Sequence, residues 1–399
     1  MDQSRTRLWT KDFVIVSSIN FFITLIFYLL MVTLAIYAVN ELDASTSEAG
    51  LISGIFIIGT LIGRLLIGRF IDSIGRKKTL FIGLIFFTLT TLLYFVDLGI
   101  GFLLVNRLIH GMAMGMASTA TGTIVAQIIP ATRKGEGIGY YSMSATLATA
   151  IGPFIGLYMA QHTSFQVIFS FCLALGVISL ITAFFLYVPA LKVTAKVTES
   201  KGFKLSNFIE PKALPISIIT LLLAFCYSSV LSFISFYAIE IDLVNTASFF
   251  FVVYAVAVLI SRPFSGPLMD RKGSNFIMYP AFIIFGVGLL LLSMTTNSFT
   301  LLAAGFLIGL GFGNMQSSSQ AIAVKLTPPH RMGMATSTFF IMLDAGLGFG
   351  PYILGFIIPV TGYSTLYVIL GVLVIATSVL YYFLHGKKER TARTNLASI

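Results

Sequence analysis

Long apolar runs separated by short polar segments make up almost the whole chain. Because about 20 apolar residues carry a helix across a bilayer, each run predicts a membrane-spanning helix. Some connections are very short, for example residues 295–298 and 361–364, and short connections force neighbouring helices to be antiparallel. The pattern predicts twelve spans, at residues 13–39, 48–70, 79–98, 101–127, 137–160, 165–188, 214–238, 246–267, 276–295, 298–322, 334–358 and 363–385.

The composition indicates that lipid is the solvent of this protein. Hydrophobic residues make up 57% of the 399 positions and charged residues only 10%, whereas soluble domains carry about 25% charged residues. A soluble fold could not bury so much apolar surface, so we predict an all-α membrane protein. The cysteines, Cys172 and Cys226, lie in apolar segments of opposite halves and predict buried thiols rather than a disulfide. The first apolar run is too long for a signal peptide and predicts the first span.

Basic residues fix the predicted orientation. With alternating spans, all lysines and arginines except Arg107 fall on one side of the membrane. Under the positive-inside rule that side is cytoplasmic, and both termini lie there. The net charge of +10 reflects this bias and not nucleic-acid binding, and we expect a multi-pass protein of a bacterial plasma membrane. The opposite connections carry acidic residues, namely Glu41, Asp43, Glu48, Asp97, Glu240 and Asp242.

The two halves of the chain repeat each other at an offset of 198 residues. The evidence for the repeat is the matching of residue types that are scarce in this chain, because matches of apolar residues arise by chance in so apolar a sequence. A half-length repeat predicts two related helix bundles around a central pathway. We expect a six-helix bundle at 1–188, a cytoplasmic linker at 189–213, and a second six-helix bundle with a short basic tail at 214–399. The matched pairs are Arg64 and Arg262, Gly68 and Gly266, Asp72 and Asp270, Gly75 and Gly273, Pro130 and Pro328, Arg133 and Arg331, Gly135 and Gly333, and Gly152-Pro153 and Gly350-Pro351.

The segment after the second span resembles the cytoplasmic loop signature G-x-x-x-D-R-x-G-R-[RK] of the major facilitator superfamily. It departs from the signature at Ser73, and the second copy departs at Ser274, which stands in place of an arginine. The matching residues are Gly68, Asp72, Gly75, Arg76 and Lys77 in the first copy and Asp270, Arg271 and Gly273 in the second.

Two motifs inside the spans indicate which branch of the superfamily the chain resembles. Arg107 and Gly111 in span 4 are similar to the R-x-x-x-G motif of proton-coupled members. Residues 152–156 in span 5 resemble the G-P-x-x-G motif of drug exporters, with Ala148 where that motif usually has glycine. The chain therefore looks like the twelve-span drug:proton antiporters, which export drugs or metabolites.

The resemblance gives the loop signature a mechanical role. Glycines there permit a close approach and a tight turn between spans 2 and 3. In family members the aspartate at the position of Asp72 meets the N-terminal end of span 11. Such helix-dipole and charge-assisted contacts, about 1–3 kcal/mol, would latch the two bundles; the alternative is a solvated charge that marks topology. The predicted latch residues are Gly68, Asp72, Gly75, Arg76, Asp270, Arg271 and Gly273.

Three ionisable side chains are predicted well inside a span, where a charge is costly and needs a reason. Arg107 and His110 are three residues apart, hence on one face of span 4, and Asp344 lies near the middle of span 11. A carboxyl in a low-dielectric site can alternate between protonated and charged forms. We predict Asp344 as the proton carrier and His110 as the second candidate, and the resemblance implies that Arg107 influences the proton site. A structural hydrogen bond for Asp344 and simple packing against span 1 for His110 stay open.

Gly-Pro pairs occupy matching positions in spans 5 and 11. Proline kinks a helix and glycine lets a neighbour approach closely, so the pairs suit either rocking bundles or close packing without motion. By analogy with the family, spans 1, 4, 7 and 10 line a cavity whose aromatic and methionine side chains suit bulky amphipathic compounds, although such residues also commonly face lipid. The predicted kink residues are Gly152, Pro153, Gly156, Gly350 and Pro351. The predicted cavity residues are Asn20, Tyr28, Met112, Met116, Tyr141, Tyr227, Phe233, Asn314, Gln316 and Phe339.

The sequence contains no enzyme signature. It has no phosphate-binding loop for ATP and no metal-spaced Cys/His cluster, so we expect no cofactor, no metal and no enzymatic activity. The leading hypothesis is a monomeric secondary transporter that exports a small amphipathic compound in exchange for protons by alternating access. One alternative is an importer or facilitator of a sugar or other metabolite, which the span-5 motif disfavours. The other is a lipid flippase or a membrane sensor without transport.

Overall fold

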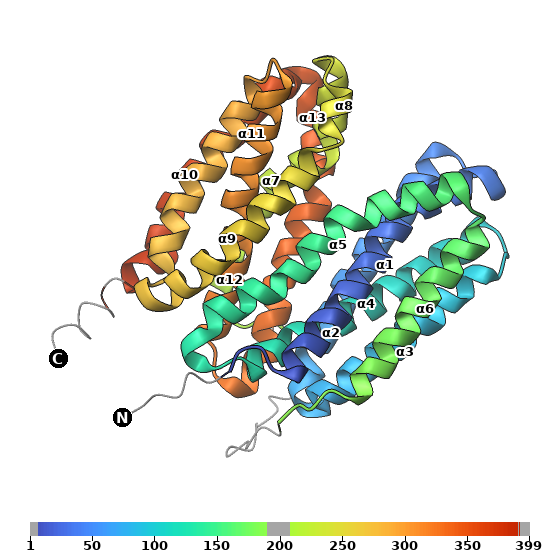
Figure 1. Cartoon of the computed structure of the whole chain (residues 1–399), viewed down its shortest axis with the longest axis horizontal. Helices are drawn as coiled ribbons and strands as arrows, with labels where there is room; N and C mark the ends of the chain where they lie inside the picture. The colour runs from blue at the N-terminus through green and yellow to red at the C-terminus, as the bar shows by residue number, and fades with distance from the viewer. Residues whose placement is uncertain (1–6, 190–207, 390, 392–399) are drawn as a thin grey trace. The chain divides into compact units, whose positions relative to one another are not determined.

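The computed structural model describes residues 7–189, 208–389 and 391, and every regular element in this part of the chain is helical (Figure 1). Most of the predicted linker, residues 190–207, lies outside the described residues. The long helices of the N-terminal half are α1 (Lys11–Glu41), α2 (Thr46–Ile74), α3 (Arg76–Leu92), α4 (Ile100–Ile128), α5 (Lys134–His162) and α6 (Phe165–Phe184). Those of the C-terminal half are α7 (Leu214–Glu240), α9 (Phe250–Lys272), α10 (Ser274–Ser293), α11 (Ser298–Ile308), α12 (Asn314–Lys325) and α13 (Met332–Tyr381). Short elements are η1 (Leu93–Phe95), η2 (Ala131–Arg133), α8 (Val244–Ala247), η4 (Gly309–Gly313), η5 (Pro329–Arg331) and η6 (Tyr382–Gly386).

Eleven helical segments of the described residues are long and apolar enough to cross a bilayer. The eleventh is much longer than one span, because α13 alone runs through 50 residues. Its backbone leaves the helical region at Gly362, with φ 74° and ψ 168°, within the predicted connection 361–364. Glycine adopts positive φ without a steric penalty, which explains why the break falls at this residue.

The chain divides into two compact units, each built from segments of both halves of the sequence. The division passes through α5 and α13, so the first residues of each of these helices belong to a different unit from the rest. The predicted boundaries at 188 and 214 follow the polar stretch between the spans and the sequence repeat, and stay a prediction. The first unit comprises residues 1–130, 144–210 and 327–338, and the second 131–143, 211–326 and 339–399.

In the first unit, α2 packs closely along α4, and glycines make this approach possible. A methyl group added to Gly59 or Gly63 of α2 would overlap the backbone of α4, and one added to Gly111 or Gly115 would overlap the backbone of α2. Both pairs are four residues apart, the spacing at which small residues let two membrane helices meet.

In the second unit, a π-helical turn, η4, separates α11 from α12 and interrupts the predicted span 298–322. Gly311 in this turn packs against α10, where an added Cβ would lie 2.6 Å from the backbone nitrogen of Phe285. π-Helical turns are uncommon and occur often at functional sites. Hydrophobic periodicity does not reveal such a turn, since the apolar run continues through it.

Candidate functional site

The first loop signature forms a polar cluster in the first unit, where α2 ends and α3 begins. Gly75 joins the two helices with φ 99°. One terminal nitrogen of Arg76, Nη2, donates to Oδ1 of Asp72 at 2.8 Å and to the carbonyl oxygen of Pro329 at 2.6 Å. The other carboxylate oxygen of Asp72 accepts a hydrogen bond from the backbone N–H of Gly333 at 3.2 Å. Asp72, Arg76, Pro329 and Gly333 are called the first loop cluster below.

The contact with Gly333 explains why an aspartate suits this position. Gly333 is the second residue of α13, so the carboxylate of Asp72 meets the N-terminal end of that helix. Unpaired N–H groups and the helix dipole both favour a negative charge there. This is the contact that the family resemblance implies for Asp72.

The second loop signature forms the corresponding cluster in the second unit. Gly273 turns the chain between α9 and α10 with φ 93°. The carboxylate of Asp270 accepts from the backbone N–H groups of Gly135 at 2.8 Å and Glu136 at 2.9 Å, at the start of α5. Lys325 at the end of α12 donates to Oδ1 of Asp270 at 2.7 Å. Asp270, Lys325, Gly135 and Glu136 are called the second loop cluster.

The positively charged side chain that pairs with the aspartate comes from a different position of the repeat in each cluster. In the first, Arg76 holds Asp72 and also donates from Nη1 to Oε1 of Gln127 at 2.8 Å. The repeat aligns Gln127 with Lys325 and Arg76 with Ser274. The second cluster therefore takes its positive charge from Lys325 at the end of α12 and has a serine at the loop position.

Of the predicted latch residues, only Arg271 is exposed.

Ser274 has a different partner, Glu389, at the C-terminal end of the described helices. The carboxylate of Glu389 accepts from the backbone N–H of Ser274 at 2.7 Å, from its hydroxyl at 2.6 Å, and from the N–H of Asn275 at 2.9 Å. It thereby caps the N-terminus of α10. His385 lies 3.1 Å from the same hydroxyl.

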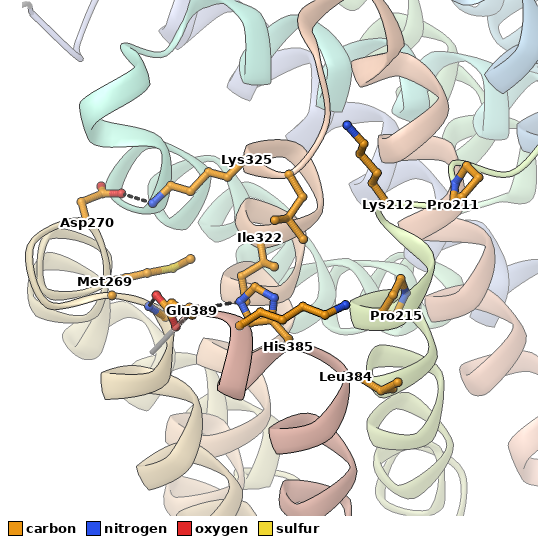
Figure 2. A pocket seen from close by; sticks show the side chains of 14 residues that line it. Pro211, Lys212, Pro215, Met269, Asp270, Ile322, Lys325, Leu384, His385 and Glu389 are labelled. Carbon is orange, nitrogen blue, oxygen red and sulfur yellow. Dashed lines mark hydrogen bonds and ion pairs between the residues drawn. The ribbon is translucent and has the colours of Figure 1, made fainter. Parts of the chain in front are cut away.

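A cavity of about 750 Å³ lies beside the second loop cluster (Figure 2). Its wall combines apolar side chains such as Met269 and Ile322 with charged side chains. Figure 2 shows the ion pair between Asp270 and Lys325 at one edge and His385 at another. The second loop cluster therefore borders open space within its own unit.

Close helix contacts flank both clusters. Gly68, one turn before Asp72, faces α13, where an added Cβ would lie 2.5 Å from Cβ of Ser337. Gly266, one turn before Asp270, faces α5, where an added Cβ would lie 2.6 Å from Cα of Glu136. Both glycines thus allow a close approach of two helices, Gly68 against a side chain and Gly266 against backbone.

These contacts predict a difference between two glycine variants. We expect Gly68→Ala to be destabilising by about 1–3 kcal/mol through overpacking, and Ser337→Gly to restore most of that stability because it removes the clashing side chain. Gly266→Ala meets backbone, so Glu136→Ala should not restore it. The midpoint of thermal unfolding of the four variants measures this, and equal rescue of both glycine variants would contradict the packing described.

Arg107 and His110 form a fully buried cluster with Tyr94 of η1 in the first unit. Nδ1 of His110 lies 2.8 Å from the Tyr94 hydroxyl, and Nη1 of Arg107 donates to the same oxygen at 3.3 Å. The guanidinium of Arg107 lies 4.2 Å from the ring centre of Phe56, and its Nε donates to the carbonyl oxygen of Ile52 at 3.4 Å. Among the described residues no carboxylate pairs with Arg107.

Asp344 lies on the part of α13 that belongs to the second unit, and it is half-buried. Arg107 and His110 belong to the first unit, so neither unit by itself brings the three predicted proton-coupling residues together. Tyr94, which joins Arg107 to His110, was not predicted. A tyrosine at the end of an apolar run gives no signal of its own in the sequence.

Several predicted cavity residues make polar or aromatic contacts inside one unit. In the first unit, Asn20 donates to Ser144 at 2.8 Å and accepts from Thr121 at 3.3 Å. In the second, the ring of Tyr227 stacks on Phe312 with 4.1 Å between ring centres. Tyr141, Asn314 and Phe339 are also buried, while Tyr28, Met112, Met116, Phe233 and Gln316 are half-buried.

The predicted kink residues lie at close contacts. An added Cβ on Gly152 would lie 2.7 Å from Cβ of Tyr28, and one on Gly156 would lie 3.0 Å from the carbonyl oxygen of Leu29. Gly350 contacts the side chain of Ser228 on α7 in the same way. Pro153 and Pro351 follow inside the helices α5 and α13.

Apolar helices of spanning length and a loop cluster repeated in each half indicate a helical membrane protein built from two related halves. The sequence model of the Major Facilitator Superfamily matches residues 16–279 and 243–398. The chain belongs to this family, which confirms the predicted resemblance, and its members are transporters and not enzymes.

Curated relatives include exporters. The chain is 29% identical over 357 residues to an uncharacterised MFS-type transporter of Methanocaldococcus jannaschii, covering 88% of this chain and 92% of the relative. It is 22% identical over 361 residues to the staphylopine export protein of Staphylococcus aureus, covering 86% and 88%. It is 25% identical over 343 residues to the quinolone resistance protein NorA of Staphylococcus aureus, covering 84% and 86%.

A solved structure shows the same fold. The transporter FucP in its outward conformation superimposes with a TM-score of 0.76 at 15% sequence identity, covering 95% of this chain and 99% of FucP. At this identity the similarity concerns the fold alone.

Proposed function

We propose that this protein is a twelve-span, proton-coupled exporter of a small amphipathic compound or drug that works by alternating access. It acts as a monomer in a bacterial plasma membrane, with both termini in the cytoplasm. The pair of loop clusters carries the proposal, because each anchors the start of a helix from the opposite half of the sequence. The names of two relatives, an export protein and a quinolone resistance protein, support the direction of transport.

The two loop clusters act as latches in this proposal. Asp72 holds the N-terminus of α13 and Asp270 holds the N-terminus of α5 in one state of the transport cycle, and both contacts break in the other. Each contact is worth about 1–3 kcal/mol, which is enough to shift a balanced two-state equilibrium without locking it. The kink residues Gly152 and Gly350 accommodate the accompanying helix motion.

Protonation of Asp344 drives the cycle in this proposal, with Arg107 and His110 influencing the proton site. A membrane potential near 100 mV supplies about 2.3 kcal/mol per charge, and one pH unit adds about 1.4 kcal/mol. One proton per cycle therefore sustains a gradient of roughly a few hundredfold for a neutral substrate.

Transport in everted membrane vesicles tests the proposed function. With an imposed pH gradient, acid inside, we expect vesicles containing the protein to accumulate ethidium well above vesicles without it. Nigericin, which collapses the pH gradient, should abolish the difference. Accumulation that is equal with and without the gradient would indicate a facilitator, and no accumulation of any amphipathic probe would contradict export.

A further inference from the structure

Arg262 is a buried cation on α9 that the proposed mechanism does not use. Its side chain is 2% exposed. One terminal nitrogen donates to the hydroxyl of Ser317, and the other donates to the carbonyl oxygen of Gly313 at 2.9 Å. Both acceptors are neutral, and in the described part of the chain no carboxylate pairs with Arg262.

The surroundings of Arg262 contain hydrogen-bond donors without acceptors. A guanidinium offers five N–H groups, and Nε of Arg262 has no partner. Gln320, one turn beyond Ser317 on α12, is 3% exposed and its amide nitrogen also has no partner. Leaving such donors unpaired in a buried site costs about 1–3 kcal/mol each, so the site favours a ligand that brings acceptor oxygens.

The second latch covers this site. Arg262, Gly266 and Asp270 are four residues apart and share one face of α9. The start of α5 lies against that face: an added Cβ on Gly139 would lie 3.7 Å from Cδ of Arg262, and the N–H of Gly135 binds Asp270. If the contact between Asp270 and the start of α5 breaks and α5 moves away, α5 no longer covers Arg262.

We propose that Arg262 binds the carboxylate of a transported compound, and that carboxylate-bearing amphiphiles are the preferred substrate class. This inference rests on the proposed export function and on release of the second latch. The planar guanidinium matches the two oxygens of a carboxylate. Gln320, one turn beyond Ser317 on α12, supplies a neutral donor.

A matched pair of fluorescent probes tests the proposal: 1-pyrenebutyrate and 1-pyrenebutanol, which differ in the carboxylate. By anisotropy we expect the purified wild-type protein to bind the butyrate roughly tenfold tighter or more, the ratio expected for one charge-assisted contact. Arg262→Gln should remove this preference and Arg262→Lys should keep part of it. Lys272→Gln, an exposed cation on the same helix, is the matched control and should leave the ratio unchanged.

The latch provides a second measurement that does not require a stable Arg262 variant. Asp270→Asn should raise the apparent affinity for the butyrate and not for the butanol, because the uncovered state becomes more populated. Equal affinities of the wild type for the two probes, or an unchanged ratio in Arg262→Gln, would overturn the proposal. Proton-driven accumulation of 1-pyrenebutyrate in everted vesicles is scored separately: its absence together with an Arg262-dependent probe ratio would reject the export function but not the anion site.

Discussion

Replacing Asp344 by asparagine is expected to reduce proton-driven transport at least about a hundredfold while the protein remains folded. Asparagine has nearly the same shape as aspartate but cannot bind and release a proton at neutral pH. Asp344 is half-buried, so a neutral amide is tolerated at least as well as a charge. Proton-driven flux should therefore be lost through chemistry and not through instability. Ethidium accumulation in everted vesicles, together with the thermal unfolding midpoint, measures both quantities.

A matched carboxylate elsewhere in the chain controls this experiment. Asp242 has φ 56°, a conformation that asparagine also adopts readily, and it lies outside the apolar segments. Asp242→Asn removes a carboxylate of the same type and should transport at close to the wild-type rate. Unchanged pH-driven accumulation in Asp344→Asn would eliminate Asp344 as the proton carrier and leave His110 as the remaining candidate.

Hydrophobic patterning predicted the helices because the bilayer imposes one rule, a run of apolar residues of spanning length. It did not predict η4, the π-helical turn at Gly309–Gly313, whose glycines pack tightly against α9 and α10. It predicted the connection at residues 361–364 that contains Gly362, but not that the residues on both sides of this glycine stay helical. Both features depend on the glycine backbone and on neighbouring helices, which a hydropathy pattern does not record.

The site was predictable where the repeat preserves residue type. Asp72 and Asp270 stand at matching positions, and each lies against the start of a helix. Lys325 was not predicted, because its counterpart in the first half, Gln127, is uncharged and only identical residues reveal the repeat. Arg262 was visible as a repeat of Arg64, but its unpaired donors become apparent only when the helices are packed.

Lys325→Gln is expected to weaken the second latch, and moving the cation back to the loop should restore it. The ammonium of Lys325 lies 2.7 Å from Asp270, whose side chain is 7% exposed, while that of Lys325 is 34% exposed. Removing a partner from this partly exposed pair should cost about 1–3 kcal/mol, below the value for a fully buried one. We expect a fall in ethidium transport of roughly tenfold and a lower unfolding midpoint.

The double variant Lys325→Gln/Ser274→Arg copies into the second cluster the arrangement of the first, in which Arg76 donates to both Asp72 and Gln127. The new arginine follows Gly273 as Arg76 follows Gly75, so its guanidinium should reach Asp270 and recover most of the lost transport. Glu389 is the competitor, because its carboxylate already binds residue 274. Rescue that appears only after Glu389→Gln would show this competition. No rescue in either background would mean that the position of the cation, and not only its charge, fixes the latch.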